Sequence, residues 1–197
     1  MWLSLSQSFQ QIGTNKGVLY QAMKGSNQEK NNYVRSQILN TLLGMMKEQD
    51  FHAIVISNLT ERACVGRASF YRNFTSKEDV LRQEANRLAG EWKQLYEQEE
   101  HTAPTEILIS LLDFHKDHSD FYLALYQAGL EKIVLDILLK QVEISPELPN
   151  AVAYLRSSIA YLIFGWIVEW MKRGMQESGT ELAKMISDAQ HTKMNTI

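Results

Sequence analysis

The sequence has little cysteine and little proline. Its one cysteine, Cys64, excludes an internal disulfide and a zinc site built on several cysteines. The three prolines stand where other signals already indicate chain breaks, at Pro104, Pro146 and Pro149. Apolar residues recur with helical spacing nearly everywhere, and no β-hairpin signal stands out. These observations predict an all-α fold of about nine helices.

A basic leader and a long apolar run are also missing. The opening segment MWLSLSQSFQ has no positive charge before its apolar residues, so we expect no secretory signal peptide. The longest uncharged apolar run, residues 157–168, is shorter than the roughly 20 residues that a bilayer requires. We interpret it as a buried helix of a soluble, cytoplasmic protein that does not enter the membrane.

The motifs of common enzyme classes are absent. The chain has no nucleophile elbow, phosphate-binding loop, dinucleotide fingerprint or HExxH motif. His115 and His118 flank Asp117, but two histidines without a third ligand are more typical of a pocket or surface than of a metal site. The sequence therefore predicts no enzyme, no metal and no cofactor.

The net charge of −3 is unevenly distributed along the chain. Residues 28–82 carry eight Lys and Arg against six Asp and Glu, whereas the chain from residue 83 carries ten against seventeen. A mildly basic head on an acidic body is compatible with a head that binds nucleic acid.

The stretch TERACVGRASFYRNFTSKEDVL, residues 60–81, holds the most specific signal. Predicted helices at 57–63 and 67–74 are too short to bury a core alone, and a predicted helix at 32–49 can support them. This is the geometry of a helix-turn-helix, whose second helix enters the DNA major groove. The spacing of Phe70 and Phe74 predicts that they pack inward, while Ser76 and Asp79 form a capping box that opens a long helix.

The stretch resembles the N-terminal DNA-binding segment of the TetR family of bacterial transcriptional regulators. The matching residues are Glu61, Arg62, Ala63, Val65, Arg67, Phe70, Tyr71, Arg72, Phe74, Ser76, Lys77, Glu78 and Asp79. The resemblance implies contacts to double-stranded DNA, with Lys77 on a phosphate. The residues that it assigns to DNA are Ser57, Arg67, Ala68, Ser69, Tyr71, Arg72, Asn73 and Lys77.

Three residues depart from the family pattern. Val55 stands where the family has a capping Thr or Ser, so we expect Ser57 to replace it as the cap. Cys64 replaces the usual turn glycine, at a position that often requires a positive φ. Gly66 replaces the Ser that caps the recognition helix.

The family pattern divides the chain into an N-terminal arm at 1–28, a helix-turn-helix domain at 29–75 and a domain for effector binding and dimerisation at 76–197. Further helices are predicted at 104–117, 119–129, 131–143, 150–174 and 180–190. We expect a homodimer through the last two helices. We expect a pocket for a small-molecule effector between the 104–129 region and the helix at 150–174. Its predicted lining is His115, His118, Tyr122, Tyr126 and Trp166.

Two readings of function remain open at this point. The first is a ligand-responsive regulator, a repressor that binds a pseudo-palindromic operator as a homodimer. The second is a TetR-like co-regulator that acts through a protein partner, which the weakly basic head and the departures at Val55 and Cys64 motivate. The role of the aromatic residues in the C-terminal half is open too, because they can line a ligand cavity or simply fill the core.

Overall fold

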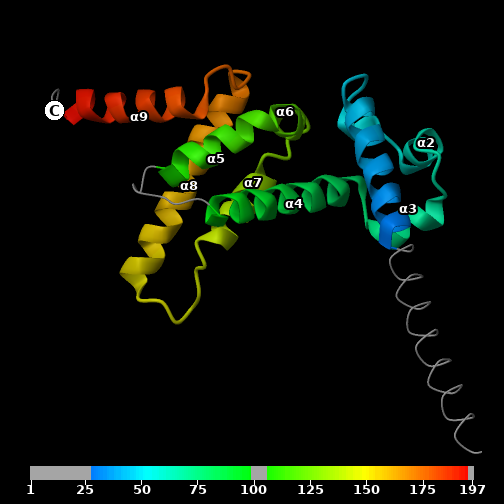
Figure 1. Cartoon of the computed structure of the whole chain (residues 1–197), viewed down its shortest axis with the longest axis horizontal. Coiled ribbons are helices and arrows are strands. Elements are labelled where there is room, and N and C mark those ends of the chain that lie inside the picture. The colour runs from blue at the N-terminus through cyan, green and yellow to red at the C-terminus, as the bar shows by residue number, and fades with distance from the viewer. Residues whose placement is uncertain (1–27, 99–105, 195–197) are drawn as a thin grey trace, which may run out of the picture. The chain divides into compact units, whose positions relative to one another are not determined.

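The computed structural model describes residues 28–98 and 106–194, and within them every regular element is a helix. The predicted arm at 1–28 lies outside the described residues, apart from residue 28. Figure 1 shows the helices in chain order. After a first helix at residues 28–46 come the 3-10 helix η1 (Phe51–Ala53), α2 (Ile56–Arg62), α3 (Arg67–Asn73), α4 (Lys77–Gln98), α5 (Glu106–Asp117), α6 (Ser119–Gln127), α7 (Lys132–Gln141), α8 (Asn150–Lys172) and α9 (Gly179–Met194).

The predicted all-α fold is confirmed, and most helix bounds agree within a few residues. The chain is already helical at residue 28, ahead of the predicted start at residue 32. The sequence pattern did not reveal η1, which buries Phe51 and is capped by Asp50 through a 2.7 Å hydrogen bond from the His52 amide. A three-residue turn of this kind is too short to show an apolar period.

The described residues form two compact units. The first unit holds the chain up to Leu42 together with Val55–Lys77, and the second holds Leu43–Ile54 and the chain from Glu78 onward. Each unit has its own apolar interior. In the first, Ile38, Leu42, Leu59 and Phe70 are completely buried.

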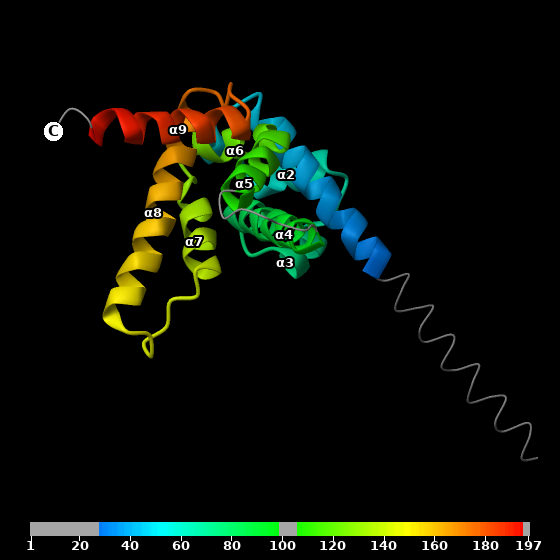
Figure 2. The ribbon, with the colours of Figure 1, turned by 60° about the vertical axis from the view of Figure 1, so that its left-hand side comes forward.

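Within the second unit, α5 packs along α9, and α7 and α6 pack on α8. Figure 2 shows α7 beside α8 and α9 crossing near the end of α8. The start of α9 is fixed by side chains. The Gly179 amide donates to the Asp113 carboxylate of α5 at 2.7 Å, and Ser178 and Glu181 form a reciprocal capping box. Lys116 donates to the carbonyl oxygens of Met175 and Gln176.

The interpretation of the apolar run in α8 as a buried helix is wrong. By length and composition it is the one helix in the described part of the chain that could cross a membrane, a criterion that core helices of soluble proteins also meet. Only 11% of its most apolar window is buried within the chain. Its exposed residues include Tyr154, Leu155, Tyr161 and Leu162. The run is apolar, as predicted, but the described residues of one chain leave this face exposed.

Gly179 offers a sharp test of the α5–α9 contact. A Cβ atom at this position would lie 2.6 Å from the backbone nitrogen of Asp113 and 2.5 Å from its Oδ1, distances that real Cβ contacts do not show. We expect Gly179→Ala to lower the free energy of unfolding by about 1–3 kcal/mol, as other overpacked sites do. Urea denaturation followed by circular dichroism measures the change.

Gly90→Ala is the matched control, because a Cβ there meets nothing within 4 Å. Alanine is the better helix former, so this variant should keep or raise the stability by up to about 1 kcal/mol. Equal stabilities of the two variants would contradict the packing described for Gly179.

Candidate functional site

The turn between α2 and α3 sets the orientation of α3 relative to α2. The Cys64 amide donates to the Glu61 carbonyl at 3.0 Å, and the Val65 amide donates to the Thr60 carbonyl at 3.0 Å. This pair of bonds is a Schellman motif, which ends a helix with a residue in the left-handed conformation. Cys64 has φ 53°, as its departure from the family glycine predicted. A non-glycine residue there costs about 1 kcal/mol.

The helix caps differ in part from expectation. The N-cap of α2 is Val55, which makes no side-chain capping bond. The expectation that Ser57 caps α2 is wrong, because Ser57 lies inside the helix and its hydroxyl points to Asn58 Oδ1 at 3.5 Å. Gly66 is the N-cap of α3, as predicted, also without a side-chain bond.

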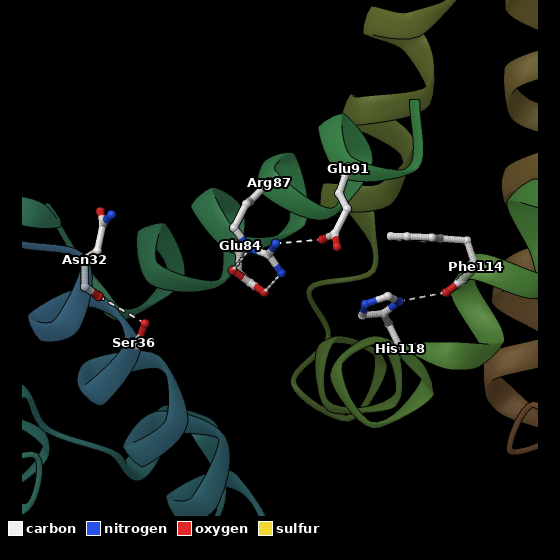
Figure 3. Close-up of polar contacts among 7 residues, drawn as sticks. All are labelled: Asn32, Ser36, Glu84, Arg87, Glu91, Phe114 and His118. Atoms are coloured by element: carbon white, nitrogen blue, oxygen red, sulfur yellow. Dashed lines mark hydrogen bonds and ion pairs between the residues drawn. The ribbon is translucent and has the colours of Figure 1, made fainter. Parts of the chain in front are cut away.

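Two phenylalanines anchor the recognition helix α3. Phe70 and Phe74 are buried, as predicted, and their ring centroids lie 5.8 Å apart. The Arg35 guanidinium of the first helix lies over the Phe74 ring at 5.5 Å. The first helix carries its own local bond from the Ser36 hydroxyl to the Asn32 carbonyl at 3.0 Å, drawn in Figure 3. Burial of the two rings fixes which face of α3 remains outside.

The outer face of α3 holds most of the residues assigned to DNA. Arg67, Ala68, Tyr71 and Arg72 are exposed and Ser69 is half-buried. The half-buried Asn73 donates to the Ser69 carbonyl at 2.8 Å, so its amide also ties the last turn of α3. The predicted residues outside this helix are Ser57, exposed in α2, and Lys77, half-buried at the first position of α4.

A cavity of about 250 Å³ lies within the second unit. Helices α4, α5, α6, α7 and α8 contribute to its wall. The lining residues are Ala85, Ala89, Trp92, Ile107, Leu108, Leu111, Phe114, His115, Tyr122, Val134, Ile137, Leu138, Gln141, Val142, Ile159, Ala160 and Ile163. Almost all of these side chains are apolar, which is typical of small-molecule sites.

His115 and Tyr122 from the predicted pocket both line this cavity. Their rings stack with centroids 4.1 Å apart and an interplanar angle of 20°. The His115 Nδ1 donates to the Leu111 carbonyl at 2.7 Å. Burial lowers the pKa of His115 to about 4, and burial also raises the pKa of Tyr122.

His118, Tyr126 and Trp166 are not among the lining residues. For His118 the reason is a break between α5 and α6 at this residue, whose φ of −108° and ψ of 25° are not helical. The predicted single face through His115, His118 and Tyr122 required a continuous helix. Instead, the His118 Nδ1 turns back to the Phe114 carbonyl at 2.9 Å, as Figure 3 shows. The pattern also gave no sign that α7 and Trp92 form part of the wall.

Trp92 is held by a hydrogen bond from its Nε1 to the Ser110 hydroxyl at 3.2 Å. One turn earlier in α4, Arg87 is enclosed by two acids (Figure 3). Its guanidinium donates to both carboxylate oxygens of Glu84 and to Glu91 at 2.7–2.9 Å, and the bonds with Glu84 raise the pKa of Arg87.

Nowhere in residues 28–98 and 106–194 do three His, Cys, Asp or Glu residues form a group able to hold a metal ion.

Family models match both halves of the chain. The model for bacterial regulatory proteins of the tetR family matches residues 38–83, and the model for a transcriptional regulator C-terminal region matches residues 102–192. The chain belongs to the TetR family. It is therefore a member of a family of transcriptional regulators that typically bind DNA and respond to ligands.

Solved structures share the fold at low sequence identity. Lin0861 from Listeria innocua is 18% identical with a TM-score of 0.70, over 83% of this chain and 92% of that one. A TetR transcriptional regulator from Streptococcus agalactiae 2603V is 17% identical with a TM-score of 0.56, over 81% and 94%. A TetR-family regulator described for Syntrophomonas wolfei is 18% identical with a TM-score of 0.56, over 82% and 95%. No curated protein matches the chain in sequence.

The buried imidazole of His115 predicts a dependence of stability on pH. The unfolded chain protonates this histidine near its ordinary pKa of 6.5, whereas the folded protein does so only near pH 4. Its contribution is therefore complete above pH 6.5 and decreases as the pH falls toward 4. From pH 7 to pH 5 the free energy of unfolding should drop by about 2 kcal/mol on this account.

Urea denaturation at several pH values, with His115→Phe beside the wild type, measures this contribution. The variant should lose the His115 part of the pH dependence, whereas His118→Phe, outside the cavity, should keep most of it. Parallel stability curves for the wild type and His115→Phe would show that His115 is not buried in this way.

Proposed function

We propose that the chain is a soluble, cytoplasmic repressor that binds a pseudo-palindromic operator as a homodimer and releases it when a small effector fills the cavity. The observation that carries this proposal is the outer face of α3. Phe70 and Phe74 hold the helix by burial, while Arg67, Tyr71 and Arg72 stay exposed. Exposed arginines on a recognition helix suit base edges and phosphates of the major groove.

The exposed face of α8 supports dimerisation. Tyr154, Tyr161 and Leu155, Leu162 each stand seven residues apart, so they form one stripe along the helix, with exposed fractions of 51–70%. An apolar stripe of this kind on a soluble protein marks an interface. A two-fold dimer would give the operator its two half-sites, one for each recognition helix.

DNA binding has a direct mutational test. Arg67→Ala should remove about 1–3 kcal/mol of discrimination at one base pair if its guanidinium reads a guanine. The salt dependence of binding should decrease only slightly. Tyr71→Phe, which removes only the hydroxyl, should weaken binding to all sequences alike if that hydroxyl bonds a phosphate. Fluorescence anisotropy with the DNA upstream of the chain's own gene, over a range of salt concentrations, measures both effects.

Lys93→Ala is a suitable control, because Lys93 is an exposed cation of α4 outside the helix-turn-helix. Its affinity for the operator should match that of the wild type. Wild-type affinity in both head variants would contradict the assignment of α3. Absence of any salt-dependent DNA binding would instead favour the co-regulator reading, in which a protein partner supplies the DNA contact.

The dimer interface predicts a change in oligomeric state. Leu162→Asp places a carboxylate on the exposed α8 stripe, where pairing would have to bury it at a cost of several kcal/mol. Analytical ultracentrifugation should show the wild type at twice the chain mass of 22.7 kDa and the variant as a monomer. Leu95→Asp, on an equally exposed leucine of α4, should remain dimeric. A monomeric wild type at micromolar concentration would contradict the proposal.

A further inference from the structure

Among the residues that the structure describes, no charged side chain lines the cavity. A carboxylate, phosphate or ammonium group buried there would lose its hydration without gaining an opposite charge, which costs several kcal/mol. The residues that could offset this cost within the wall are polar but uncharged at neutral pH. The cavity therefore selects against ligands that must bury a charge.

Two arginines in the helices that form the wall already have partners. Arg87 is paired with Glu84 and Glu91, so its guanidinium faces two carboxylates. Arg156 of α8 donates to the carbonyl oxygens of Val142 and Glu143 at 3.1 and 3.0 Å, at the carboxyl end of α7. A ligand carboxylate would have to compete with these bonds.

His115 provides a directional polar group inside the apolar wall. Its Nδ1 must carry a proton, because the Leu111 carbonyl at 2.7 Å can only accept. In the neutral ring the other nitrogen, Nε2, is then an acceptor, on the side of the ring away from this bond. The stack on Tyr122 and the bond to Leu111 hold the ring in one orientation.

We propose that the cavity takes a compact, uncharged, largely apolar molecule that carries one hydrogen-bond donor, such as a hydroxyl group, and that Nε2 of His115 accepts this bond. This inference rests on the proposed function, since it names the chemical class of the effector. It excludes acids and amines that are charged at neutral pH. The selectivity lies in this acceptor, because a ligand without a donor would cover Nε2 without bonding to it.

Three probes of similar size separate the contribution of the hydrogen-bond donor from that of a charge. 1-Octanol has the donor, its isomer heptyl methyl ether has an acceptor but no donor, and octanoate has the charge. Isothermal titration calorimetry of the full chain at pH 7.5 should give octanol a dissociation constant about tenfold lower than the ether, the value of one hydrogen bond. Octanoate should bind at least as weakly as the ether, because its charge would lose its hydration. In His115→Phe the preference for octanol over the ether should disappear.

Octanoate binding as tightly as octanol, equal binding of octanol and the ether, or no binding of any probe would overturn the inference. These comparisons on the wild type decide it even if His115→Phe does not fold. Operator binding is measured in parallel by anisotropy. Octanol that binds with the expected preference but does not release DNA would leave the ligand class standing and contradict the proposed ligand response. Octanoate that binds as tightly as octanol and does release DNA would do the opposite.

Discussion

The hydrogen bond between the Gly179 amide and the Asp113 carboxylate anchors α9 to α5 within the second unit. It fixes the first turn of α9 on α5, and Lys116, one turn further along α5, holds the carbonyls of Met175 and Gln176 just before it. The opposite side of α5 supplies Leu111, Phe114 and His115 to the cavity. One helix thus both anchors the end of the chain and forms a wall of the ligand site, so a shift of α5 cannot affect one without the other.

The stability of the helix-turn-helix depends on side-chain burial, which offsets unfavourable local features of its short helices. Its helices α2 and α3 have seven residues each, too few to be stable alone, and neither has a side-chain N-cap. Cys64 adds a left-handed residue to the same turn. The burial of Phe70, Leu59 and Phe74 offsets these local costs. Local sequence preference is therefore weak in this segment, and tertiary packing decides its conformation.

The packing of the recognition helix could be predicted from the sequence because that information is local and ordered, whereas the expected cap of α2 at Ser57 was wrong. The buried face of α3 was predicted by the four-residue spacing of Phe70 and Phe74 and by a family pattern with no gaps. The positive φ of Cys64 followed from its place in the turn. The cavity was only partly predictable. Whether His118 continues α5 depends on packing that no short pattern records, and the contribution of α7 arises from contacts between residues far apart in the chain. The bond between Asp113 and Gly179 joins residues 66 positions apart, and no short pattern in the sequence indicates it.

The position of α8 has a thermodynamic consequence. Ile159, Ala160 and Ile163 form part of the cavity wall, while Leu155, Tyr161 and Leu162 on the same two turns face outward along the stripe proposed for dimerisation. A rigid helix cannot adjust one of these faces to a guest without moving the other. Coupling between two sites is reciprocal, so a molecule that loosens the pairing of two chains must itself bind more tightly to separated chains. Effector affinity would then vary with the concentration of the regulator, and dilute protein would be the more sensitive detector.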